Sequence, residues 1–332
     1  MQPAHTPAHS SAGAQIAAFH KSLWRTSPPL TAVGTLMIVV AAASLVGVFA
    51  DPRTITGAPA WLKPLKFAIS TSIYALTLAW VFGFLTEWPR MRRIVGWTTA
   101  IVFVLEVAII DLQAWRGTTS HFNTSSTLNQ VLFGVMGLAI MIQTFASVAV
   151  AVALWRQPFT DRALGWALRF GMTLTIAGAM TGPLMTRPTT KQLADVRAGR
   201  GMPVVGGHTV GGLDGGRGMP VTGWSREHGD VRVPHFIGLH AIQALALVAF
   251  GVRRWRRPES ARVKAVWILA ASYASLFLLL LWQALRGESV MVPDGAILAS
   301  IAVWAGLTVI ALGVVALGSS RASRNGFNQR TA

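Results

Sequence analysis

Eight long apolar stretches constrain the fold of this chain more than any other feature. They are Leu30–Ala50, Phe67–Leu85, Ile94–Leu112, Val131–Trp155, Ala163–Met185, Phe236–Val252, Val266–Leu285 and Ala296–Leu317. A helix needs about 20 predominantly apolar residues to cross a bilayer. Charged residues make up only 12% of the chain, against about 25% in a soluble domain. We therefore predict an all-α, polytopic integral membrane bundle of eight transmembrane helices, with the lipid bilayer as its main partner.

Two polar tails and one long loop lie outside the apolar stretches. Residues 1–29 are small and polar and predict a disordered cytoplasmic tail, residues 30–318 hold the eight helices, and residues 319–332 predict a second cytoplasmic tail. Between the fifth and sixth helices lies the Gly-rich loop, residues 188–232, in which the sequence GRGMPV occurs twice. The loop contains no GxxxxGK[ST] motif, so we interpret it as a flexible or self-packed loop rather than a phosphate cradle. We expect it to be mobile in the absence of ligand.

The basic residues predict the orientation of the bundle. If the N-terminus is cytoplasmic, the short cytoplasmic segments hold 16 Lys and Arg and the short segments on the other side hold 5. Short cytoplasmic loops of membrane proteins are enriched in these residues, so we predict both termini in the cytoplasm of a cell with a bacterial-type inner membrane. The net charge of +17 is spread between the apolar stretches and forms no single basic patch, so we expect no nucleic-acid partner.

Polar side chains converge on the extracytoplasmic ends of the predicted helices. The stretch 224–243, WSREHGDVRVPHFIGLHAIQ, leads into the sixth helix and carries three of the eight histidines. An ionisable group within the bilayer costs several kcal/mol unless it is paired, which directs attention to Glu106, Asp111 and His240. We expect Asp111 and His240 to lie at similar depth and to share a site if the third and sixth helices are neighbours. A hydrogen bond between helices is the simpler role for His240 alone.

The histidine spacing limits how a metal ion could be bound. His235 and His240 are five residues apart, about 140° around a straight helix, so both cannot bind one ion from such a helix. His240 shares a face with Gln243, three residues later, and we prefer it to His235. The chain has no cysteine, so any metal ion must be bound by His, Asp or Glu.

Three classes of function remain open. A redox protein would hold haem b or a divalent metal on His121 and His240. A metal-dependent membrane hydrolase would bind zinc through His121, His235 or His240 with Asp111 and would use Glu106 or Glu227 to transfer the proton. The candidate catalytic residues are Glu106, Asp111, Arg116 and Glu227. A transporter or sensor would bind a small extracytoplasmic molecule through Asp111, Arg116, His240 and Arg286. The histidines slightly favour the redox hypothesis.

Overall fold

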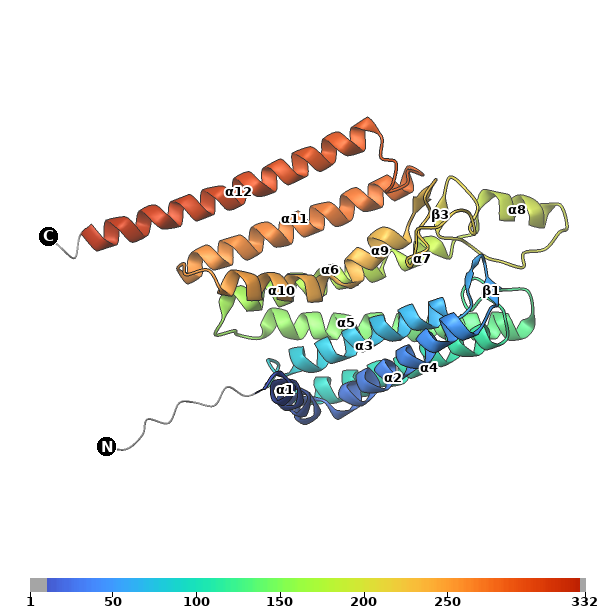
Figure 1. Ribbon diagram of the computed structural model, residues 1–332, viewed down its shortest axis with the longest axis horizontal. Helices are drawn as coiled ribbons and strands as arrows, with labels where there is room; N and C mark the ends of the chain where they lie inside the picture. Colours follow the sequence, from blue (N-terminus) through green and yellow to red (C-terminus); the bar gives the residue numbers. More distant parts are fainter. Residues whose placement is uncertain (1–10, 329–332) are drawn as a thin grey trace.

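The computed structural model describes residues 11–328, with side chains described up to residue 318. Seven long helices run side by side along the longest axis (Figure 1): α2 (Pro28–Ala50), α3 (Leu62–Phe82), α4 (Pro89–Trp115), α5 (Thr127–Arg156), α6 (Arg162–Ala179), α11 (Glu259–Leu285) and α12 (Gly295–Asn328). The shorter helices are α1 (Ala12–Thr26), α7 (Gly182–Met185), α8 (Thr190–Arg197), α9 (Arg232–Leu239) and α10 (Ala241–Arg253). Two hairpins complete the described chain: β1 (Thr54–Ile55) with β2 (Ala58–Pro59), and β3 (Thr209–Val210) with β4 (Gly229–Asp230).

The architecture confirms the predicted all-α membrane bundle. In the described part of the chain, seven helices are long and apolar enough to cross a membrane, and the number is eight if the bent pair α9–α10 is counted as one span. Helix α1 and the C-terminal end of α12 lie toward one end of the bundle, and the Gly-rich loop and the β1–β2 hairpin lie at the other (Figure 1). We call the latter the outer end, following the predicted orientation.

The predicted disorder of residues 1–29 is wrong for Ala12–Thr26, which is helical. Within residues 1–29, the segment Ala12–Thr26 forms α1, whose N-terminus is capped by the Ser11 side chain and which buries Leu23. At the other end, α12 continues to Asn328, through much of the predicted tail 319–332. The composition of residues 1–29 favours disorder, but capping and tertiary contact stabilise α1. Residues 1–10 and 329–332 lie outside the described chain.

The sixth predicted helix is broken rather than straight. Helices α9 and α10 meet at His240 and are bent by 50°. Neighbouring helices satisfy the backbone groups near the break. The Thr175 hydroxyl of α6 accepts from the Ile242 N–H at 3.2 Å and contacts the Leu239 carbonyl oxygen at 3.4 Å, and the Tyr273 hydroxyl of α11 donates to the Ile237 carbonyl at 2.6 Å. Such replacement is what makes a broken helix tolerable within a bilayer.

Close backbone packing against α6 accompanies the break. A Cβ atom placed on Gly178 would lie 2.4 Å from the Gly238 carbonyl carbon, and one on Gly171 would lie 2.7 Å from the Ile242 Cα. Only glycine permits these approaches. Helix α6 is therefore central to the bundle, with contacts to α5, α9, α10 and α11.

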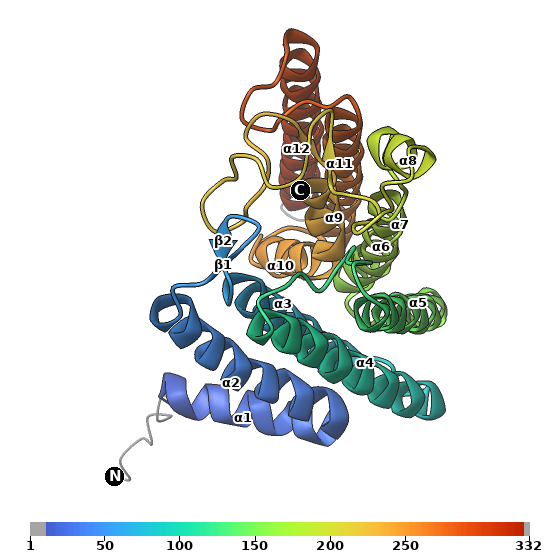
Figure 2. The ribbon, with the colours of Figure 1, turned by 90° about the vertical axis from the view of Figure 1, so that its right-hand side faces the viewer.

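The Gly-rich loop is packed over the outer end of the bundle (Figure 2). The first GRGMPV copy reaches the loop after α4, where Val204 pairs with Asn123 and the Thr124 N–H donates to the Pro203 carbonyl at 2.9 Å. The second copy folds back on its own loop, where Gly218 pairs with Ser225. The repeated sequence thus has two different partners, and mobility of the loop stays a prediction.

Candidate functional site

A polar stripe on α3 is the frame of the candidate site. Lys63, Lys66 and Ser70 follow one another at helical spacing, so they share a face of α3. That face meets the loop after α4, the end of the Gly-rich loop and the break between α9 and α10. We define the outer polar cluster as Lys63, Lys66, His121, Arg232 and His240.

Lys63 and His121 form the closest cation–imidazole contact of the cluster. The Lys63 Nζ atom lies 3.1 Å from His121 Nδ1, and the Ser120 hydroxyl lies at the same distance from that nitrogen. Burial, followed by the charge of Lys63, holds the pKa of His121 well below its usual value. A neutral His121 accepts from the ammonium group at Nδ1 and keeps its proton on Nε2. The imidazole also packs against the Phe67 ring, at a centroid distance of 5.6 Å.

Lys66 and Arg232 bind adjacent carbonyl groups of the Gly-rich loop. Lys66 Nζ donates to the Thr222 carbonyl at 3.0 Å, and Arg232 Nη2 donates to the Gly223 carbonyl at 2.6 Å. Arg232 also pairs with the buried Asp230 carboxylate at 2.6 Å. Burial alone would raise the pKa of Asp230, but the hydrogen bonds and charge of Arg232 outweigh it and lower that pKa. The two contacts attach the end of the loop to α3 and α9.

Two basic residues of the cluster form no close ion pair in the described chain. Among the described residues, neither Lys63 nor Lys66 forms an ion pair, whereas Arg232 does. The ammonium group of Lys63 instead faces a neutral imidazole, and that of Lys66 faces a carbonyl dipole. Acidic groups act on these lysines only through charge at longer range, Glu106 on Lys63 and Asp230 on Lys66.

His208 anchors the middle of the Gly-rich loop. Its Nδ1 atom lies 3.2 Å from an Asp214 carboxylate oxygen and 3.8 Å from one of Asp230. Burial and the charge of Arg232 lower the pKa of His208 to about 4, although the two carboxylates partly oppose that shift. The packed form of the loop thus favours a neutral imidazole.

The two histidines of the broken helix have different surroundings. His240, at the break, lies 3.3 Å from the Ser70 hydroxyl of α3 through Nε2 and contacts the Phe236 ring at a centroid distance of 4.5 Å. His235 Nδ1 lies 2.9 Å from the Gly178 carbonyl, to which it donates, and 3.0 Å from the Thr181 hydroxyl. His240 therefore belongs to the outer polar cluster, and His235 mainly joins α9 to α6.

The carboxylates predicted from the sequence do not join this cluster through hydrogen bonds. Glu106 on α4 is buried, with 3% of its surface exposed, and its Oε1 atom has no hydrogen-bond partner in the described chain. Asp111 is half-buried, its Oδ1 atom likewise lacks a partner, and no described hydrogen bond or ion pair joins it to His240. Glu227 is exposed in the Gly-rich loop.

Arg116 belongs to a separate network at the end of α4. It donates to the Gln113 side chain at 2.6 Å and to the Asn129 side chain at 3.1 Å, and Gln113 in turn donates to Asn129 at 3.0 Å. These contacts hold the end of α4 against the start of α5. The network gives Arg116 a structural role.

The predicted metal ligands are not gathered into one site. In the part of the chain that the structure describes, no group of three or more His, Cys, Asp and Glu residues could hold a metal ion. His121 and His240 belong to the same cluster, but each has a different protein partner. From the sequence, Lys63 and Lys66 were counted only among the basic residues that indicate orientation. The structure adds them as candidate site residues. Their three-residue spacing directly before an apolar stretch was the available signal.

Comparison with known protein families, with curated proteins and with solved structures finds no match to this chain.

Proposed function

We propose that this chain is a multi-pass protein of a bacterial-type inner membrane that binds a small anionic solute at the outer polar cluster, as a transporter or a sensor. The observation that carries the proposal is the pair Lys63 and Lys66, two basic residues at the start of a transmembrane helix that form no ion pair with any described residue. A charge at this depth is costly when unpaired. An anion would offset that cost, and a solute with a carboxylate or phosphate group fits the donors present.

The broken helix beside these lysines supports solute binding. In several transporter folds, substrate sites lie at helices interrupted within the membrane, because the interruption exposes backbone dipoles to the solute. Here the interruption is at His240, which reaches Ser70 one turn beyond Lys66. The site therefore combines ammonium groups, imidazoles and a hydroxyl group.

The Gly-rich loop would act as the cover of this site. It contacts Lys66 through Thr222, and it pairs with the segment that follows His121. A solute arriving from the outer side would replace the Thr222 carbonyl as the partner of Lys66. Binding and loop displacement would then be linked.

Binding of small anions to the purified protein tests the proposal. We would measure the affinities of small carboxylates and of inorganic phosphate at constant ionic strength, with uncharged analogues for comparison. Removing one hydrogen bond to a charged group costs about 1.5–3 kcal/mol, so Lys63→Met and Lys66→Met should each weaken binding by about 10-fold or more. Lys191→Met is the matched control, because Lys191 is an exposed lysine of α8 that pairs with Asp195.

Two results would count against the proposal. If anions bind no better than their uncharged analogues, the site does not recognise negative charge. If both lysine variants bind anions as tightly as the unaltered protein, Lys63 and Lys66 are not the binding groups. An absorption spectrum and a metal analysis of the same preparation test the redox and hydrolase hypotheses. A Soret band would select haem, and stoichiometric zinc would select a metal-dependent hydrolase.

A further inference from the structure

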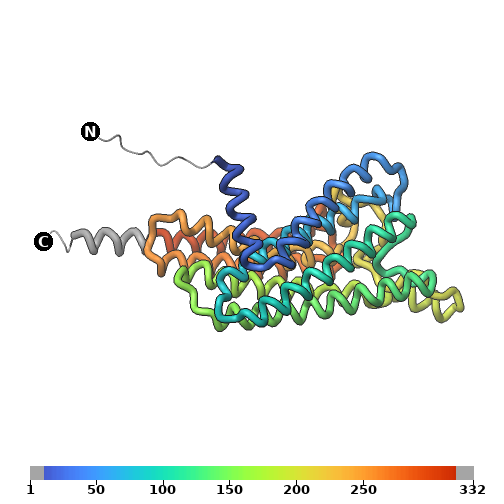
Figure 3. Tube along the Cα trace, turned by 90° about the horizontal axis from the view of Figure 1, so that it is seen from below, coloured from blue at the N-terminus to red at the C-terminus, as the bar shows by residue number. Residues whose placement is uncertain are grey.

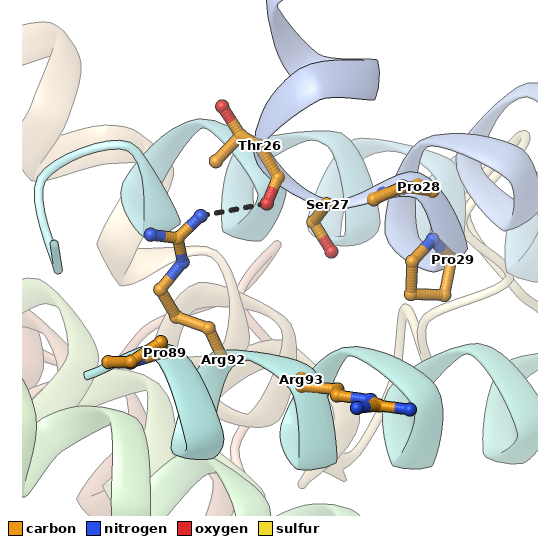
Figure 4. A pocket seen from close by; sticks show the side chains of 7 residues that line it. All are labelled: Thr26, Ser27, Pro28, Pro29, Pro89, Arg92 and Arg93. Atoms are coloured by element: carbon orange, nitrogen blue, oxygen red, sulfur yellow. Dashed lines mark hydrogen bonds between the residues drawn. The ribbon is translucent and has the colours of Figure 1, made fainter.

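A pocket lies at the opposite end of the bundle from the outer polar cluster. It is formed where α1 turns into α2, against the first turn of α4, and has a volume of about 190 Å³. Figure 4 shows the residues that line it: Thr26, Ser27, Pro28, Pro29, Pro89, Arg92 and Arg93. Three prolines give the pocket rigid walls, because each fixes its own backbone φ angle.

The pocket contains arginine donors that the protein does not fully use. Arg92 Nη2 donates to the Thr26 carbonyl at 2.9 Å, but Arg92 Nε is buried and has no hydrogen-bond partner in the described chain. Arg93 lines the same pocket, and no described ion pair involves either arginine. The Ser27 hydroxyl points into the space between them (Figure 4). A guanidinium group with a free N–H next to a hydroxyl group suits a phosphate oxygen.

Helix α1 indicates that the pocket lies at the depth of lipid headgroups. Figures 1 and 3 show α1 crossing the direction of the long helices. Its side chains Ile16, Phe19 and Trp24 are exposed, although they are large and apolar, while Lys21 and Arg25 are also exposed and lie four residues apart. A helix of this composition lies in the plane of the membrane interface, with its apolar side chains among the lipid chains.

Contacts with α2 fix α1 in that position. Leu23 is buried, with 3% of its surface exposed, and His20 Nε2 lies 3.1 Å from the Thr35 hydroxyl of α2. The pocket is at the C-terminal end of α1, so its position relative to the interface is set by the same contacts. This end of the bundle also carries the excess of basic residues that marks the cytoplasmic side.

We propose that this pocket binds the phosphate group of an anionic phospholipid of the cytoplasmic leaflet. Arg92 and Arg93 supply the charge and the hydrogen-bond donors, Ser27 supplies a hydroxyl group, and α1 packs over the lipid chains beside the headgroup. Lipid rather than free phosphate is the expected source, because the apolar residues of α1 place a bilayer next to the pocket. Basic residues near an anionic membrane surface strengthen such binding.

Lipid nanodiscs test this proposal without reference to the solute. We would reconstitute the full chain in phosphatidylcholine alone or with phosphatidylglycerol, and measure its thermal stability and the lipids that remain bound after mild detergent extraction. Phosphatidylglycerol should raise the melting temperature of the unaltered protein. In Arg92→Gln/Arg93→Gln, most of this increase should vanish, and retained phosphatidylglycerol should fall at least threefold.

The controls separate a defined site from general surface charge and from protein misfolding. Arg254→Gln/Arg256→Gln removes the same charge from exposed positions at the same end of the bundle and should retain lipid like the unaltered protein. Arg92→Lys, which keeps the charge but loses the guanidinium geometry, should retain an intermediate amount. Lipid retention is measured only on monodisperse protein, which excludes misfolded material. The ratio of retained phosphatidylglycerol to retained phosphatidylcholine can then be compared between variants, even if one of them is less stable in phosphatidylcholine alone.

The proposal is overturned if both double variants lose lipid equally, since that result would show only general surface charge. It is also overturned if inorganic phosphate, added to phosphatidylcholine nanodiscs, stabilises the unaltered protein as much as phosphatidylglycerol does. That result would assign the pocket to a soluble ion.

Discussion

Replacing Gly178 by alanine should destabilise the bundle by separating α6 from α9. The new Cβ atom would lie 2.4 Å from the Gly238 carbonyl carbon and 2.5 Å from the Leu239 nitrogen, whereas ordinary van der Waals contact begins at 3.4 Å. The two backbones must therefore move apart by about 1 Å. Overpacking of this kind costs about 1–3 kcal/mol. The same movement lengthens two contacts, from His235 Nδ1 to the Gly178 carbonyl and from the Thr175 hydroxyl to the Leu239 carbonyl.

Each hydrogen bond between helices in a membrane is worth about 0.6 kcal/mol, so the expected loss of unfolding free energy is roughly 2–4 kcal/mol. Equilibrium unfolding in mixed detergent micelles measures it. Gly134→Ala in α5 is the matched control, because no atom lies within 4 Å of its added Cβ, and it should be neutral or stabilising by up to about 1 kcal/mol. If Gly178→Ala were as stable as Gly134→Ala, the close packing of α6 and α9 would be refuted.

Three further predictions concern topology, independence of sites and pH. Reporter fusions at Gly117 and Pro258 should report the outer and cytoplasmic sides respectively, and an outer signal at Pro258 would overturn the orientation. The effects of Asp111→Asn and His240→Ala on thermal stability should add, because no described contact joins the two residues, and a double variant no worse than either single one would show coupling. Since the pKa of His208 is lowered to about 4 from 6.5, protonation from pH 6.5 downward favours the open loop. Proteolysis of the loop should therefore be faster at pH 5 than at pH 7.5, and His208→Asn, compared under the same protease conditions, should reduce the difference.

The sequence predicts those features of the fold that depend on apolar length. Helices α2 and α11, for example, follow directly from long apolar stretches, because the bilayer sets a minimum length and excludes unpaired backbone groups. The break at His240 could not be predicted in this way. It is accompanied by close packing of Gly178 against Gly238 and by the Thr175 hydroxyl, and both depend on a helix about 60 residues earlier in the chain.

The candidate site was predictable only in part. The sequence directs attention to His121 and His240, because histidines at helix ends are unusual in so apolar a chain, and their role in one site stays a prediction. Lys63 and Lys66 were missed, because lysines at the end of an apolar stretch ordinarily indicate only topology. The actual partners of these lysines are the Thr222 carbonyl and the His121 imidazole. Both lie far from the lysines in the sequence, so the sequence alone does not reveal them.

The break at His240 has a mechanical consequence for the outer half of the bundle. In a continuous helix, backbone hydrogen bonds would transmit any tilt of the first turns to the turns below. Here the Ile242 N–H is bound to Thr175, which holds α10 to α6, while Arg232 and Asp230 tie α9 to the Gly-rich loop. Helix α9 is held to α6 by a second and separate set of contacts, from Gly238 to Gly178 and from His235 to the Gly178 carbonyl, so the two halves of this span are anchored independently of each other.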